Sequence, residues 1–202
     1  QYVHAYKLKD QAPQLLEGLP KTVSDFGVGV SYTFDSRDFM LNASRGWFMQ
    51  LDLTTNPTFL GNNNTYWSAE LQLATYRKAW RGAIIAGELH TRQSTGQVPW
   101  PMLADVGSSN RMRGYYEGRY RDKNVIDAQV ELRQHIWHRN GIAVWLGAAE
   151  VFPSYSDMRF SRILPNAGVG YRWQFKKGVN VRLDYGFSRN GTGFIFNINE
   201  AF

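Results

Sequence analysis

The chain contains no cysteine and no apolar run long enough for a membrane helix. None of its 202 residues can form a disulfide, which fits passage through the periplasm without requiring it. The longest apolar runs, such as 143–149, are strand-sized, whereas a membrane helix needs about 18 consecutive apolar residues. Because only helices and closed barrels span a bilayer, a membrane-spanning form of this chain has to be a β-barrel.

Aromatic residues and glycine are abundant. Aromatics make up 15% of the chain and there are 19 glycines, as expected where aromatic girdles ring a barrel and small residues ease its bends. The net charge of +6 would suit nucleic acid or an anionic membrane surface. Many arginines, however, fall at inward positions of the expected strands. The chain begins with Gln1 rather than Met, which indicates a processed mature form or a fragment.

Apolar and polar residues alternate with a period of two in segment after segment. Residues 26–34 place Phe, Val and Tyr on one face and Gly, Ser and Thr on the other. The same alternation predicts strands over 47–53, 67–73, 83–89, 126–136, 142–152, 169–175, 179–187 and 192–202. Residues 2–9 are a weaker tenth candidate, and single-chain bacterial barrels have even strand numbers. The sequence therefore predicts an all-β protein, a transmembrane antiparallel β-barrel with about ten strands in this chain.

A soluble β-sandwich or lipocalin-like barrel is the alternative, since its strands also alternate. Such a fold would turn its apolar face inward and would bury few charged side chains on the opposite faces of long strands. The charged residues of 126–136 and 179–187 favour the membrane barrel.

The last strand carries the C-terminal pattern typical of outer-membrane barrels. One face holds the apolar residues Phe194, Phe196, Ile198 and Phe202. Gly191 and Gly193 lower the strand character of this element and make a weak seam plausible. By parity Glu200 should lie on the outer face, which would place the chain end at the edge of the bilayer.

Connections alternate in length, with tight joints at 139–141 and 176–178 and a long segment over 92–124. Short periplasmic turns and long outer loops connect the strands of such barrels, and a loop this long is usually functional. Within it, residues 111–123 interleave basic and aromatic side chains. They suit a single-stranded RNA-binding segment or, in a barrel, a surface loop that faces lipopolysaccharide.

Several motifs resemble the BamA/TamA outer-membrane assembly superfamily. The run Met112-Arg113-Gly114-Tyr115 is similar to its hydrophobic-Arg-Gly-aromatic loop motif. Asp35-Ser36-Arg37-Asp38 with Arg45-Gly46 is similar to its first strand pair, and 181–186 and 196–202 to its last two strands. The resemblance covers 25–202, and implies that these strands are part of a sixteen-strand barrel or form a shortened one, without POTRA modules.

The resemblance also implies a contact between loop and barrel wall. In that family the loop Arg folds into the lumen and pairs with inner-wall acids, so we expect one barrel domain over 1–202 with the extracellular loop 92–124 folding toward the lumen. Glu131 is the inward acid on the strand after the loop. The place of a second family acid is Gly147, and Asp184, inward by parity, could substitute for it. Glu150, outward by parity, could not.

Two functions follow from the resemblance. The first is an assembly factor in the outer membrane of a Gram-negative bacterium, which helps to insert or translocate proteins or lipids through a weak seam. The second is a scaffold barrel that anchors a partner. Expected partners are outer-membrane lipid and lipopolysaccharide, unfolded outer-membrane protein clients and a periplasmic or barrel partner, but no nucleic acid. The four histidines are too scattered for a metal cluster and no nucleophile has a nearby His, so we expect no catalysis, metal or cofactor.

Overall fold

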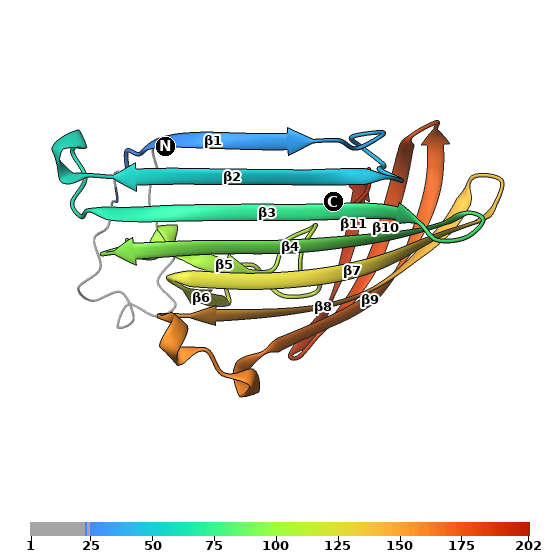
Figure 1. Ribbon diagram of the computed structural model, residues 1–202. Coiled ribbons are helices and arrows are strands. Elements are labelled where there is room, and N and C mark those ends of the chain that lie inside the picture. The colour runs from blue at the N-terminus through green and yellow to red at the C-terminus, as the bar shows by residue number, and fades with distance from the viewer. Residues whose placement is uncertain (1–22, 24) are drawn as a thin grey trace.

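The computed structural model, which describes residue 23 and residues 25–202, contains a nine-stranded antiparallel sheet. Its strands are β1 (Val28–Asp35), β2 (Gly46–Asn56), β3 (Tyr66–Lys78), β4 (Ala83–Gly96), β7 (Asn124–Trp137), β8 (Asn140–Phe152), β9 (Leu164–Lys176), β10 (Val179–Ser188) and β11 (Gly191–Ile198). Each strand pairs with its neighbours in chain order. The sheet curls, so that β9 to β11 lie behind the plane of β1 to β4 (Figure 1).

These strands confirm the predicted fold class, and each coincides with one of the nine periodic segments. The weak tenth candidate at 2–9 lies outside the described residues. Within the described part of the chain β1 and β11 are the two edges of the sheet and are not paired with each other.

The two faces of the sheet differ as a barrel in a bilayer requires. Large apolar side chains are exposed along the outer face, for example Val130, Leu146 and Val169. The inner face carries buried polar residues, including Gln129, Glu131 and Asp184. In water this arrangement would expose apolar surface and bury charge, whereas in a membrane lipid covers the outer face.

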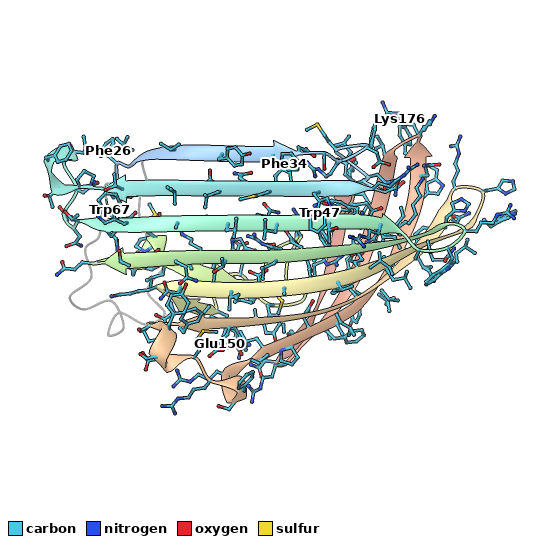
Figure 2. All side chains as sticks on the ribbon, viewed as in Figure 1. Phe26, Phe34, Trp47, Trp67, Glu150 and Lys176 are labelled. Carbon is cyan, nitrogen blue, oxygen red and sulfur yellow. The ribbon has the colours of Figure 1, made fainter. Side chains whose placement is uncertain are left out.

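Exposed aromatic side chains lie near both ends of the first strands. Figure 2 shows Phe26 and Trp67 near one end and Phe34 and Trp47 toward the other, all on the sheet's outer side. Phe26 and Phe34 are eight residues apart in an extended chain, which corresponds to roughly 27 Å along the strand. Exposed aromatic side chains at both ends of an apolar stretch are the pattern of the two girdles that flank the apolar band of a membrane barrel.

Short and long connections lie at opposite ends of the sheet, here called the turn end and the loop end. The turn end has 79–82, 138–139 and 177–178, together with the longer 36–45. The loop end has 57–65, 97–123, 153–163 and 189–190. In the described residues no helix is long and apolar enough to cross a membrane.

Two predicted connection boundaries were wrong. The long loop begins after Gly96 rather than at 92, because β4 continues with polar residues on both faces, which hides its alternation. The tight joint predicted at 139–141 is a two-residue turn at 138–139, where His138 has a φ of 51°. Asn140 and Gly141 already pair within β8.

The predicted course of the last residues was also wrong. β11 ends at Ile198, and Asn199 adopts a φ of 71°, which turns the chain into the lumen. Glu200 therefore points inward with a side chain only 2% exposed, and its backbone N–H donates to Leu41 O across the turn end. Phe202 packs against the inward Tyr76, with ring centroids 6.3 Å apart. The outward position predicted for Glu200 assumed that side chains alternate to the end of the chain. One residue in the left-handed conformation, Asn199, reverses this alternation for the residues after it.

Candidate functional site: a loop held in the barrel lumen

The connection between β4 and β7 packs inside the curl of the sheet. It contains a small two-stranded sheet, β5 (Ala104–Val106) and β6 (Tyr120–Asp122), which lies behind β4 and β7 (Figure 1). Its apolar residues join wall residues in one buried cluster formed by Ala104, Val106, Met112, Tyr115, Val125, Ala149 and Leu164. This cluster holds the loop against the inner wall and so positions its tip, residues 111–115.

Arg113 at the tip bridges two strands of the wall. Its Nη2 donates to Glu131 Oε2 on β7 at 2.5 Å, and its Nη1 donates to Asp184 Oδ2 on β10 at 2.6 Å. All three side chains are fully buried. A planar guanidinium can satisfy two carboxylates at once, and in a site without water each contact is a strong charge-assisted hydrogen bond.

An aromatic ring and an amide complete the surroundings of Arg113. The guanidinium carbon lies 3.6 Å from the Trp145 ring centroid, in cation–π geometry. The indole N–H donates to Asn166 Oδ1 at 2.8 Å, and the Asn166 amide donates to the Arg113 carbonyl at 2.5 Å. Gly168 makes room for the ring, since a Cβ there would lie 2.0 Å from Trp145 Cζ2.

The neighbours of Arg113 in the motif fit the wall by shape. Met112, with a φ of 49°, is buried, and its Sδ would lie 3.3 Å from a Cβ placed at Gly147. Where the resemblance implied a second acid on β8, this chain therefore packs a thioether over a glycine. Burial raises the pKa of the Tyr115 hydroxyl, which donates to Pro165 O at 2.7 Å.

Gly114 brings the loop backbone against the last two strands. It has a φ of 102°, which favours glycine, and a Cβ there would lie 2.6 Å from Gly186 O on β10. A Cβ built on Gly193 of β11 would lie 2.9 Å from Gly114 Cα. Glycines on three segments thus let the tip approach the edge of the sheet at backbone distance.

Further arginines and an acid extend the network toward the turn end. Arg133 Nε donates to Glu131 Oε1 at 2.7 Å, and Arg172 Nη1 donates to Asp184 Oδ1 at 2.5 Å. Arg172 Nε also donates to Glu200 Oε2 at 2.7 Å. Arg182 lies 3.4 Å from Asp184 Oδ2 and donates to Ser109 O in the loop. Four arginines therefore share three carboxylates in a buried cluster, here called the lumenal network.

The motif residues at the end of β1 and the start of β2 stabilise the connection between these two strands. Arg37 pairs with Asp35 at 2.7 Å and stacks 4.4 Å above the Phe48 ring. Asp38 accepts hydrogen bonds from the backbone of Ser44 and Arg45. These residues stabilise the 36–45 connection, which closes over the turn end.

Some members of the lumenal network follow from sequence parity and some do not. Glu131 and Asp184 were expected inside, and the structure places both on Arg113. Arg133, Arg172 and Arg182 share the same inward parity, which was a usable signal for adding them. Glu200 and Trp145 were missed. Glu200 was placed outward because of the turn at Asn199, whereas Trp145 shares the inward parity of Ala143 and Gly147, a signal that the sequence analysis did not use.

The described residues contain no group of three or more His, Asp or Glu side chains arranged to hold a metal ion. The acids of the lumenal network are instead paired with guanidinium groups, an arrangement that holds the loop against the wall.

A curled antiparallel sheet with a lipid-facing apolar exterior and a charged loop locked inside defines a transmembrane β-barrel with a lumenal plug segment. Residues 3–202 match the sequence profile of the Omp85 superfamily domain. The chain belongs to the Omp85 superfamily.

Solved structures share this fold. The chain is similar to BamA from Haemophilus ducreyi lacking POTRA domains 1–3, with a TM-score of 0.68 and 15% sequence identity. The match covers 87% of this chain and 42% of that one, so this chain spans less than half the length of the BamA structure. No match was found among curated proteins.

Proposed function

We propose that this protein is an outer-membrane assembly factor of a Gram-negative bacterium, which aids insertion or translocation of proteins or lipids through a weak barrel seam. Its clients would be unfolded outer-membrane proteins, and lipid or lipopolysaccharide its surroundings. The observation that carries the proposal is the bridge from Arg113 to Glu131 and Asp184. Membership of the Omp85 superfamily and the BamA-like fold support it.

The bridge ties a loop to the strand next to the sheet edge. Asp184 lies on β10, whose outer neighbour β11 contacts the loop tip through Gly193. In a complete barrel the free edge of β11 faces the seam, and Gly191 and Gly193 weaken this strand. The lumenal network would hold β10 and β11 in place while the seam opens.

The test is reconstitution of the purified chain into liposomes with an unfolded barrel protein as client. We expect the wild-type chain to accelerate client folding. Arg113→Ala and Glu131→Ala should insert in part and lose most of this acceleration. Arg121→Ala is the matched control, because its ion pair with Asp105 in the same loop is 3.4 Å long and partly exposed. Full activity in both lumenal variants would contradict the proposed role of the bridge.

A scaffold barrel that anchors a partner is the second candidate. The buried ion pairs of the lumenal network favour this second candidate, because they can hold the loop and the strands in one arrangement without any part in client folding. A correctly inserted wild-type chain that does not accelerate client folding would support this alternative.

A further inference from the structure

Three tight hairpin turns lie side by side at the turn end of the sheet. They connect β3 to β4, β7 to β8 and β9 to β10, and these six strands are consecutive in the sheet. Backbone hydrogen bonds join each hairpin to the next: His135 N donates to Gly82 O at 2.8 Å, and Gln174 N donates to Arg139 O at 2.7 Å. The hairpins therefore form one continuous edge. This edge, here called the turn rim, consists of residues 77–82, 135–141 and 174–178.

The turn rim carries basic side chains and no acidic one. Its lysines and arginines are Arg77, Lys78, Arg81, Arg139, Lys176 and Lys177. All six are exposed, and none of them forms an ion pair with another described residue. At the loop end, by contrast, the connections 97–123 and 153–163 each contain both acidic and basic residues. Unpaired positive charge is thus concentrated along the turn rim, where Figure 2 shows Lys176.

The acids nearest to this end of the sheet bind other groups. Asp35 pairs with Arg37 at 2.7 Å beside the 36–45 connection. Asp38 accepts hydrogen bonds within that connection, from the backbone N–H groups of Ser44 and Arg45. Glu200 is buried in the lumenal network. No acid of the described chain therefore neutralises the turn rim, and its charge is available to a partner.

Aromatic side chains indicate that the turn rim lies at the surface of the bilayer. Trp80 and Trp137 of the rim are 58% and 65% exposed. Trp80 Nε1 donates to Gln134 Oε1 at 2.8 Å, on the outer face of β7. Phe175, on the outer face of β9, is also exposed. Exposed tryptophans at the end of an apolar band are typical of the level of the lipid headgroups. The basic side chains beside them are therefore within reach of lipid phosphates.

We propose that the turn rim binds anionic phospholipids, whose phosphate is not balanced by an ammonium in the same headgroup. Short connections of such barrels face the periplasm, so the lipids beside the rim belong to the phospholipid leaflet and not to the leaflet that carries lipopolysaccharide. Lysine and arginine at a membrane surface attract anionic lipids, and a guanidinium can donate two hydrogen bonds to one phosphate. A zwitterionic headgroup brings an ammonium of its own toward the unpaired cations and binds less well. This binding does not depend on any role of the chain in client folding.

The experiment is gel filtration of the full chain in detergent with equal amounts of phosphatidylglycerol and phosphatidylethanolamine, followed by quantification of the lipids that co-elute with it. We expect phosphatidylglycerol to be enriched about fivefold over phosphatidylethanolamine, relative to empty micelles, which is the factor that one basic residue supplies at a membrane surface. The enrichment should disappear in 1 M salt, because the Debye length there is only about 3 Å.

Matched triple variants locate the site. Arg77→Gln, Arg81→Gln and Arg139→Gln together should bring the ratio of the two lipids close to that of empty micelles. Arg159→Gln, Arg162→Gln and Arg189→Gln together remove the same charge from exposed positions at the loop end, and should keep the wild-type ratio. Equal ratios in the two triple variants would overturn the proposal.

Two measurements on the wild-type chain test the proposal without any substitution, so it stays testable even where the rim variant fails to fold. A ratio that matches empty micelles, or an enrichment that persists unchanged in 1 M salt, overturns the proposal. An acidic protein is the other occupant that such a rim would suit. Binding of poly-glutamate to the chain without any preference between the two lipids would assign the rim to such a protein instead of the membrane.

Discussion

Trp145 and Gly168 lie on neighbouring strands and fit each other: the ring of Trp145 occupies the space that any side chain at position 168 would need. A Cβ at Gly168 would come within 2.0 Å of Cζ2 of that ring. The ring in turn covers the Arg113 guanidinium, so the glycine acts on the loop through the tryptophan.

Gly168→Ala should therefore destabilise the barrel by about 1–3 kcal/mol, the usual cost of overpacking a filled site. Urea unfolding of the reconstituted chain, followed by tryptophan fluorescence, measures the change. Gly87→Ala is the control, because a Cβ there meets only Thr75 Cγ2 at an ordinary 3.5 Å. Equal stability of the two variants would show that the ring moves aside without cost.

Gly193→Ala should displace the loop tip from β11. The added Cβ would lie 2.9 Å from Gly114 Cα, which belongs to the backbone and cannot rotate away. We expect faster proteolytic cleavage within 116–121 than in the wild type. Gly191→Ala on the same strand has open space around its Cβ and should leave the cleavage rate unchanged. Protection of the loop in both variants would mean that the tip is held by Arg113 alone.

Arg113→Lys should not replace the native residue. An ammonium has a single nitrogen where Arg113 uses two to reach Asp184 and Glu131, and it cannot stack flat on Trp145. The expected loss is about 1–3 kcal/mol, the cost of leaving one buried partner unsatisfied. The midpoint of urea unfolding reports it, with Arg121→Lys as the partly exposed comparison in the same loop. A wild-type midpoint for Arg113→Lys would argue that one ion pair suffices.

Glu200→Gln should weaken the turn end of the lumenal network. It removes the charge that faces Arg172 at 2.7 Å and Arg133 at 3.5 Å, while its amide still accepts one hydrogen bond. Breaking such a buried pair costs about 3 kcal/mol. Thermal unfolding should show the loss, whereas Glu117→Gln, in the exposed part of the loop, should not. Equal melting temperatures of the two variants would contradict this prediction, and would instead fit a Glu200 side chain exposed at the bilayer edge.

The period of two was sufficient to predict the nine strands and their inward acids, because the side chains of a strand in a bilayer alternate between two chemically distinct surroundings. The alternation did not predict the end of β4 or the course of the chain after β11, because the side chains do not alternate there. Gln93 and Ser94 in β4 are both polar, so the strand was read as loop. Asn199 turns the chain by a backbone angle that no side-chain pattern encodes.

The contact of Arg113 with Glu131 and Asp184 could be anticipated from the motif together with strand parity, although its role in activity stays a prediction. The packing of Trp145 on Arg113 and the contacts of the glycines could not be predicted, because they depend on which residues of different segments come to face each other. Met112 over Gly147 is of the same kind: the sequence indicated a missing acid, and only the packing explains what fills its place.

The aromatic residues near the two ends of β1 also indicate how thick a bilayer this part of the sheet matches. Phe26 and Phe34 are roughly 27 Å apart along the strand. At the tilt usual for membrane barrels this span is roughly 20 Å along the bilayer normal. The apolar band of outer-membrane barrels is about 25 Å tall and the outer membrane is thinner than an average bilayer, so a bilayer thinner by about 5 Å would match the sheet beside this edge.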